Sequence, residues 1–412
     1  MDRNIILLPE TIYIKKMKKN QNIVTMSEEY NIYYKNILLP YDEKWDIHIN
    51  CKYGQNLGDC WRLSNYIESD NEFDFELVVY NEYGERINSK KSKIVMVDRL
   101  ENVRTKVMFI GDSMTYAQKY INHIFETLRG IETVGMRSLN DGIKQEGRGG
   151  WTYDMYFNAW NENFGLSPFL FPKGVSGAEY YGNKDFADKV NDENEVTYQY
   201  YGLGYGKLQD GQFYSSGEKL YKRENGQDVP VSEKPVFEFD FSKYLERFKL
   251  ETPEIVSVLM GANDLQICPY EESEQRIKHY VDNTARMIDE IHRADRNIKV
   301  IVNLPVLGAE QYCWGTQLGC IGSEKMYRFN IMHASCELLK KFDNRQKENI
   351  YVAPMIACID PVHGFPYTYV KANKYCEEMI VKHSNWVHPN LSGYCQMGDA
   401  LAAVIEFARK SI

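Results

Sequence analysis

The sequence predicts an α/β fold with a doubly wound parallel sheet, preceded by a smaller antiparallel β-sandwich. Two observations lead to this prediction. After residue 103, short and continuous apolar runs alternate with helical stretches, as in parallel sheets whose strands are buried on both faces. Before that point, apolar and polar residues alternate over short segments separated by turn residues, which is typical of antiparallel strands with one solvated face.

The N-terminal region, residues 1–103, is predicted to form the accessory β-sandwich behind an irregular leader. Residues 1–35 have no clear periodicity, whereas apolar residues alternate with polar ones at 45–51 and again at 73–79. A turn and a further apolar run at 94–97 complete the pattern. No arrangement of catalytic residues occurs in this region, so we expect it to serve as a packing or accessory domain.

The remaining region, residues 104–412, is predicted to contain the parallel sheet. Buried strands are expected at 107–110, 133–136, 255–260, 298–304 and 350–355. Helices are expected at 114–128, 271–293, 324–342 and 392–408. Ligands of such sheets bind at the carboxyl ends of the strands, so the residues that follow each strand are the candidates for function.

A long insertion at about 158–250 interrupts this alternation and is rich in Tyr and Gly. Insertions of this length are usually lids or binding surfaces. The segment is expected to stack on sugar rings, to form an oligomer contact, or to pack on the domain without binding a ligand or partner. The sequence leaves these three alternatives open. Its tyrosines include Tyr198, Tyr200, Tyr201, Tyr205, Tyr214 and Tyr221.

The net charge argues against nucleic acid as a partner. The chain has 49 Lys and Arg against 58 Asp and Glu, which gives a net charge of −9.

The sequence predicts a cytoplasmic protein, with non-classical export as an alternative. No apolar run approaches the roughly 18 residues of a membrane span, and no signal peptide is evident. The nine cysteines lack CxxC spacing and are expected to be reduced, a Cys51–Cys60 disulfide being the alternative.

A candidate nucleophile follows the first buried strand. Gly111, Asp112 and Ser113 form a turn between that strand and a helix, which would present the serine hydroxyl above the sheet. Backbone N–H groups of the first helical turn would point to the same place, where an oxyanion could be stabilised. Taken alone, Ser113 could equally be an ordinary helix cap.

Three further segments strengthen the catalytic interpretation. A Gly-rich turn at 146–152 could place a bare backbone N–H beside the oxyanion, and it lacks the Lys-Ser/Thr ending of a phosphate-binding loop. Asn263 follows the third buried strand and could donate a side-chain hydrogen bond to the same oxyanion. His388 precedes the last helix and could accept the serine proton as a general base.

These four segments, in this order, resemble the SGNH (GDSL-type) serine esterase and lipase family from about residue 104 to 412. The resemblance implies a flavodoxin-like five-stranded parallel sheet and hydrolysis of esters, often acetyl groups on carbohydrate, without a metal or other cofactor. It also implies that Ser113 is the nucleophile and His388 the base. The oxyanion donors would be the backbone N–H groups of Ser113 and Gly147 and the side-chain amide of Asn263.

One position departs from the family pattern. Family members usually have Asp three residues before the histidine, where this chain has Asn385. Asn385 or a backbone carbonyl could still hold the imidazole, as Asn does in Cys-His-Asn enzymes. Alternatively Asp360, which follows the last buried strand, could supply the carboxylate, or the site could bind ligand with little turnover. The pair Asp360 and His363 has the same spacing but lacks the sequence that follows His388.

The sequence thus predicts a serine esterase that hydrolyses short-chain, chiefly acetyl, esters on carbohydrate or another small alcohol. An SGNH-type O-acyltransferase and a glycan-binding protein with a decayed esterase site are the alternatives. Trp151 and Trp386 adjoin the presumed site and are expected either to wall a small acyl pocket or to pack in the core. A membrane partner is not expected, and an oligomer stays an open alternative.

Overall fold

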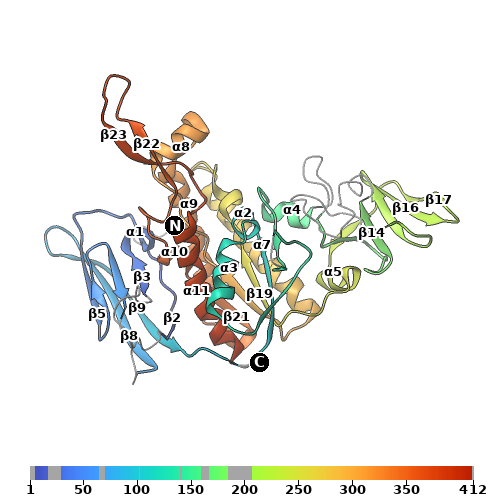
Figure 1. Ribbon diagram of the computed structural model, residues 1–412, viewed down its shortest axis with the longest axis horizontal. Coiled ribbons are helices and arrows are strands. Elements are labelled where there is room, and N and C mark those ends of the chain that lie inside the picture. The colour runs from blue at the N-terminus through green and yellow to red at the C-terminus, as the bar shows by residue number, and fades with distance from the viewer. Residues whose placement is uncertain are drawn as a thin grey trace.

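The computed structural model describes residues 5–16, 29–64, 70–101, 103–139, 142–158, 167–183 and 207–410. Figure 1 shows three parts side by side: the N-terminal sheets in blue, a central α/β unit, and a small β-rich insertion in green on the opposite side.

The central unit is built on a parallel sheet, which confirms the predicted fold class. Its strands run in the order β11, β10, β19, β20, β21, the 2-1-3-4-5 order of flavodoxin-like folds, and every neighbouring pair is parallel. A short strand, β12 (Glu146–Gly147), also pairs with β10. The five strands are β10 (Thr105–Gly111), β11 (Ile131–Val134), β19 (Ile255–Leu259), β20 (Lys299–Asn303) and β21 (Ile350–Ala353).

Helices cover both faces of the parallel sheet, as expected when the connections between parallel strands are right-handed. The chain moves one way from β10 to β11 and the other way from β19 through β20 to β21, so the connecting helices lie on opposite faces. Helix α3 (Lys119–Thr127) packs with α11 (Leu391–Arg409), and α7 (Ser273–Ala294) packs with α9 (Glu324–Phe342). The helix expected at 114–128 is divided, because Gln118 has a left-handed φ of 61° between α2 (Ser113–Tyr116) and α3.

The described residues of the N-terminal region form two larger sheets, and Trp61 of one packs edge-on against Phe75 of the other. One sheet has the order β2-β9-β8-β5 and the other β3-β7-β6. Their strands are β2 (Thr11–Lys15), β5 (Asp46–Cys51), β8 (Glu72–Tyr80), β9 (Arg86–Val97), β3 (Tyr30–Tyr33), β6 (Gln55–Asn56) and β7 (Cys60–Leu63). The β2–β9 pair is parallel, unlike the other pairs of these sheets.

The N-terminal region also packs directly on the α/β unit. A short strand pair, β1 (Ile5–Ile6) with β4 (Leu38–Leu39), flanks α1 (Tyr34–Ile37). Within α1 the buried Asn36 side chain donates to the carbonyls of Ile356 (3.0 Å) and Ile359 (2.6 Å), in and after α10 (Met355–Cys358). These long-range bonds tie the two regions together at the carboxyl side of β21.

The described part of the insertion forms its own small sheets and one helix. Tyr198, Tyr200, Tyr201 and Tyr205 lie outside the described residues. Tyr214 is buried and stacks on Tyr221 at 5.4 Å, so this ring contributes to packing inside the insertion instead of an exposed sugar platform. The elements are β13 (Leu170–Pro172), β14 (Tyr180–Asn183), β15 (Phe213–Ser216), β16 (Lys219–Glu224), β17 (Gln227–Ser232), β18 (Phe237–Phe239) and α5 (Phe241–Phe248).

The remaining elements lie near the carboxyl edge of the sheet. They are α4 (Tyr153–Phe157), α6 (Ala262–Leu265), α8 (Gln311–Leu318), β22 (Tyr367–Lys371) and β23 (Met379–His383), the last two forming an antiparallel hairpin. Within the described ranges, no helix combines the length and apolar character that crossing a membrane requires. All nine cysteines lie in those ranges as free thiols, so Cys51 and Cys60 are not paired.

Candidate active site

The turn that carries Ser113 begins at Gly111, where a side chain and a backbone carbonyl approach the chain closely. A Cβ at Gly111 would lie 2.1 Å from Thr115 Oγ1 and 2.5 Å from the Leu259 carbonyl oxygen, so only glycine fits there. The buried Asp112 then caps α2 by accepting the Met114 N–H at 3.0 Å. Ser113 therefore begins the helix with its hydroxyl at the carboxyl end of β10.

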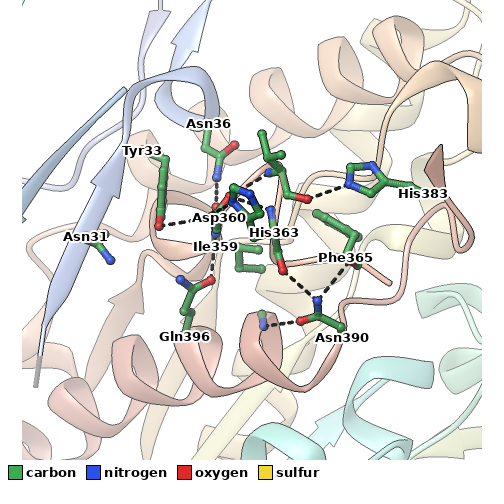
Figure 2. Close-up of polar contacts among 12 residues, drawn as sticks. Asn31, Tyr33, Asn36, Ile359, Asp360, His363, Phe365, His383, Asn390 and Gln396 are labelled. Atoms are coloured by element: carbon green, nitrogen blue, oxygen red, sulfur yellow. Dashed lines mark hydrogen bonds and ion pairs between the residues drawn. The ribbon is translucent and has the colours of Figure 1, made fainter. Parts of the chain in front are cut away.

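His388 reaches this serine from the far end of the chain. Its Nε2 lies 2.7 Å from Ser113 Oγ, a hydrogen-bonding distance. The loop that carries His388 is held by Asn390, which caps α11 through the Gly393 N–H at 3.0 Å. The Asn390 amide also donates to the carbonyls of His363 (2.7 Å) and Phe365 (3.1 Å), as Figure 2 shows.

Asn385 holds the other side of the imidazole. Its Oδ1 accepts the backbone N–H groups of Val387 (3.2 Å) and His388 (2.9 Å) and lies 3.3 Å from His388 Nδ1. Because two backbone donors require the amide oxygen at this position, the group facing Nδ1 is an acceptor. That arrangement places the proton on Nδ1 and leaves the Nε2 lone pair directed at the serine hydroxyl.

Asp360 is not the acceptor that faces His388 Nδ1, so the alternative in which it supplies the carboxylate of the site is wrong. Its carboxylate accepts the N–H groups of Val362 and His363, both at 2.8 Å, and lies 3.2 Å from His363 Nδ1. Tyr33 donates to it from the N-terminal region at 3.4 Å (Figure 2). The turn that begins at Asp360 directs the carboxylate to its own loop, away from His388.

Burial changes the acid–base properties of the site. Burial, together with the positive charge of Lys119, lowers the pKa of His388 below its ordinary value, which favours the neutral imidazole that a base requires. Burial raises the pKa of Asp112 to about 7 and that of Asp264 to about 7, the negative charge of Asp112 adding to the effect at Asp264.

Of the predicted oxyanion donors, the Asn263 amide keeps one hydrogen available, whereas the Gly147 amide is already occupied. Asn263 lies in α6, directly after β19, and its Nδ2 donates one hydrogen to the Trp151 carbonyl at 3.0 Å, which leaves the second for another acceptor. The Gly147 amide is buried and already donates to the Gln145 side chain, so its expected role as an oxyanion donor is wrong. Gly147 instead permits a close approach, since a Cβ there would lie 2.2 Å from the Tyr116 nitrogen.

The turn after Gly147 contains a glycine that the sequence analysis did not single out. The Arg148 N–H donates to the Gly111 carbonyl, and the Trp151 N–H closes the turn on the Arg148 carbonyl. Between them, Gly150 is exposed with φ of 78°. The Gly-Gly pair within this turn was the signal that could have singled it out, because a left-handed φ strongly favours glycine.

The two tryptophans differ from one another. Trp151 is only 1% exposed and packs edge-on against Tyr156 at 5.0 Å, so the expectation that its ring walls an acyl pocket is wrong. Trp386 packs on Trp314 at 4.9 Å, and its carbonyl accepts the Ala309 N–H at 2.8 Å. A role for Trp386 in the acyl pocket stays a prediction.

A polar hollow of about 470 Å³ adjoins the Asn263 side. Its lining is mostly charged or hydrogen-bonding and comprises Thr152, Asp154, Asn263, Asp264, Glu272, Gln275, Arg276, His279 and Tyr280. Across the ranges that the structure describes, no group of three or more His, Cys, Asp or Glu side chains is arranged to hold a metal ion.

The model of one protein family, GDSL-like lipase/acylhydrolase, matches residues 107–401 of this chain. The chain belongs to this family. It is accordingly a hydrolase of the GDSL-like type, which acts on carboxylic esters. The matched region begins within β10 and ends within α11, so it spans the whole parallel sheet and includes Ser113 and His388.

Solved structures that are similar to the GDSL-like chain are distant from it. The lipase/acylhydrolase from Enterococcus faecalis is 12% identical with a TM-score of 0.34, over 74% of this chain and 96% of that one. A family two carbohydrate esterase from Clostridium thermocellum, solved in complex with cellohexaose, is 13% identical with a TM-score of 0.31, over 96% and 98%. Among curated proteins, none matches the chain.

Proposed function

We propose that this GDSL-like hydrolase is a serine esterase that removes short acyl groups, chiefly acetyl, from carbohydrate. The observation that carries the proposal is the 2.7 Å contact between Ser113 Oγ and His388 Nε2, with Asn385 on the opposite ring nitrogen. A hydroxyl, a neutral imidazole and an acceptor that orients the imidazole are the parts that activate a serine nucleophile.

The proposed reaction has two steps. Ser113 Oγ attacks the ester carbonyl carbon while His388 Nε2 takes the hydroxyl proton, and the tetrahedral intermediate then releases the alcohol, which leaves with that proton. In the second step His388 takes a proton from water, the resulting hydroxide attacks the acyl-enzyme, and the carboxylic acid is released as Ser113 regains its proton. Asn385 keeps Nδ1 protonated and stabilises the imidazolium formed in each step.

The oxyanion needs donors on the side of the carbonyl opposite to His388. We assign the first oxyanion hydrogen bond to the backbone N–H of Ser113, which has no intrahelical partner at the start of α2. The second comes from the remaining hydrogen of the Asn263 amide. The Gly150 amide replaces that of Gly147 as the third donor. It is supported by the exposure of Gly150 and by the bond between the adjacent Trp151 carbonyl and Asn263.

The hollow next to Asn263 supports a polar alcohol as the leaving group. Its side chains include Asp154, Arg276 and His279, which offer hydrogen-bond acceptors and donors of the kind that sugar hydroxyls need. His279 contacts Asp154 at 2.8 Å, and Arg276 contacts Glu272 at 2.9 Å. A lipid alcohol would cover these polar pairs without adding any hydrogen bond to them.

A substrate screen tests this assignment. Purified protein is assayed on nitrophenyl acetate, butyrate and octanoate, and on acetylated xylo-oligosaccharides with acetate release as the readout. We expect turnover of acetylated sugars and a steep fall from acetyl to octanoyl, both abolished in Ser113→Ala. Equal rates on the three chain lengths would contradict the short-acyl specificity, and turnover that survives Ser113→Ala would contradict the serine mechanism.

A further inference from the structure

A second and larger hollow, of about 890 Å³, lies outside the proposed catalytic centre. It is enclosed by the hairpin β22–β23, by α8 and by the α1 segment of the N-terminal region, and its lining contains none of Ser113, Asn263 and His388. Figure 1 shows the hairpin projecting beside α8, on the side of the molecule opposite to the insertion.

The hairpin presents aromatic rings to this hollow. Tyr367 and Tyr369 alternate along β22 and so lie on one face of the ribbon, where they are 56% and 61% exposed. Their ring centroids are 6.0 Å apart, in an edge-to-face arrangement. Val381 pairs with Tyr369 across the ribbon, and Tyr312 of α8 adds a third partly exposed ring. Such a surface offers flat apolar faces with hydroxyl groups at their edges.

The wall that carries these rings is fixed in place. His383, opposite Tyr367, accepts the Glu310 N–H at Nδ1 (3.3 Å) and donates from Nε2 to the Val362 carbonyl (2.7 Å). The Glu310 carboxylate accepts the His383 N–H in return, at 3.0 Å. Because these bonds tie the hairpin to two other segments, the strand that carries the rings needs little ordering when a ligand binds.

The charges around the hollow largely compensate one another. Three basic and two acidic side chains line it, which gives a formal charge of 3 − 2 = +1. Lys382 lies 3.6 Å from the Glu310 carboxylate, and the Arg328 guanidinium donates to the Leu38 carbonyl at 2.9 Å. A ligand with a strong charge of either sign would therefore find little net attraction, whereas an uncharged ligand with many hydroxyl groups fits both the rings and the polar groups.

We propose that this hollow is a second carbohydrate site, which binds an uncharged oligosaccharide by stacking of sugar rings on Tyr367 and Tyr369. The identity of the ligand as the chain that carries the ester rests on the proposed function. The 384–388 loop contacts both sites, since the Ala309 N–H, on the wall of the hollow, donates to the Trp386 carbonyl at 2.8 Å and His388 contacts Ser113. The hollow would thus hold one part of a polymeric substrate beside the loop that carries His388.

Calorimetric titration of the Ser113→Ala protein tests the proposal, with unacetylated xylohexaose, mannohexaose and cellohexaose as the probes. We expect saturable binding of at least one of them, weakened about tenfold or more in the Tyr367→Ala/Tyr369→Ala variant, which corresponds to about 1.4 kcal/mol. Tyr375→Ala is the matched control, because Tyr375 is 84% exposed in the same hairpin region but lies outside the lining. This control should bind as the parent does, and thermal melting of all variants checks that they fold.

Three outcomes would overturn the second site. None of the three hexasaccharides binds, binding survives loss of both tyrosines, or sedimentation shows a dimer that depends on them, which would assign the surface to a second copy of the chain. Failure of the catalytic proposal is separate, because hydrolysis of nitrophenyl acetate by the unmodified protein requires Ser113 but not the hollow.

Discussion

Two loops of this protein share a Val-His ending and the same local geometry. The loop at 360–363 reads Asp-Pro-Val-His, and the loop at 385–388 reads Asn-Trp-Val-His. In each, the first side chain accepts the backbone N–H groups of the third and fourth residues and faces Nδ1 of the histidine. The turn therefore places an acceptor behind the imidazole in both loops.

The two histidines nevertheless face different surroundings. His388 meets Ser113 at the carboxyl edge of the parallel sheet and is partly buried, whereas the His363 side chain is 82% exposed. The turn that begins with Asp or Asn orients an imidazole in either place, and at the end of β10 the Ser113 hydroxyl lies within reach of His388. The turn thus orients the imidazole, and the end of β10 places the serine hydroxyl on which His388 acts.

Removal of each imidazole should separate the loops most strongly. His388→Ala is expected to reduce kcat/KM on nitrophenyl acetate by about 10³- to 10⁴-fold, because general-base assistance is lost. His363→Ala should stay within about twofold of the parent, since exposed surface changes seldom matter. Similar losses of kcat/KM in both variants would show that His388 and His363 do not differ in their contribution to catalysis.

Removal of each acceptor should have a smaller effect. Asn385→Leu deletes the group that holds Nδ1, and loss of such a bond, worth about 1–3 kcal/mol, predicts a fall in kcat of roughly 5- to 150-fold. Asp360→Leu should leave kcat within about twofold. An unchanged kcat in Asn385→Leu would mean that a backbone carbonyl or water orients His388 instead.

A carboxylate at position 385 should shift the pH profile. Burial and Lys119 lower the pKa of His388, so kcat/KM of the parent should fall only as the pH drops below about 6.5, the ordinary histidine value. In Asn385→Asp the added negative charge favours the imidazolium and raises that pKa, by about one unit or more. The acidic limb should therefore move to higher pH in a rate profile from pH 4 to 9. An unmoved limb would show that residue 385 is not the partner of His388.

The smallest expected effect is on stability. Asp360 accepts two backbone N–H groups and the Tyr33 hydroxyl, which bridges to the N-terminal region. Asp360→Ala should lower the free energy of unfolding by about 1–2 kcal/mol in urea titration, with kcat retained. A loss of activity without a loss of stability would instead give this loop a part in catalysis.

The sequence was sufficient where a pattern depends on burial alone. Mainly apolar runs located β10, β19, β20 and β21 within a few residues, because strands covered on both faces need mostly apolar side chains. The edge strand β11 reads Ile-Glu-Thr-Val with an exposed Glu132, and it begins two residues before the predicted range of 133–136. The leader was harder: β2 and β3 are short and are buried at consecutive positions, so they have no alternation to detect.

Prediction of the site failed where hydrogen bonds compete. Nothing in the glycine pattern indicated that Gln145 would occupy the Gly147 amide, which moves the proposed oxyanion donor to Gly150. Asp360 is close in sequence to the end of β21, but its own turn captures the carboxylate. Such choices among local partners depend on three-dimensional geometry, which residue spacing does not encode.

Covalent labelling measures whether Ser113 is a nucleophile that His388 activates. The protein is treated with a fluorophosphonate at pH 7, and intact mass with peptide mapping follows the adduct in the parent, His388→Ala and His363→Ala. We predict a single adduct on Ser113, formed at equal rates in the parent and His363→Ala and at least about 100-fold more slowly in His388→Ala. An adduct on another residue would rule out Ser113 as the nucleophile, and labelling of Ser113 that is equally fast without His388 would rule out His388 as its base.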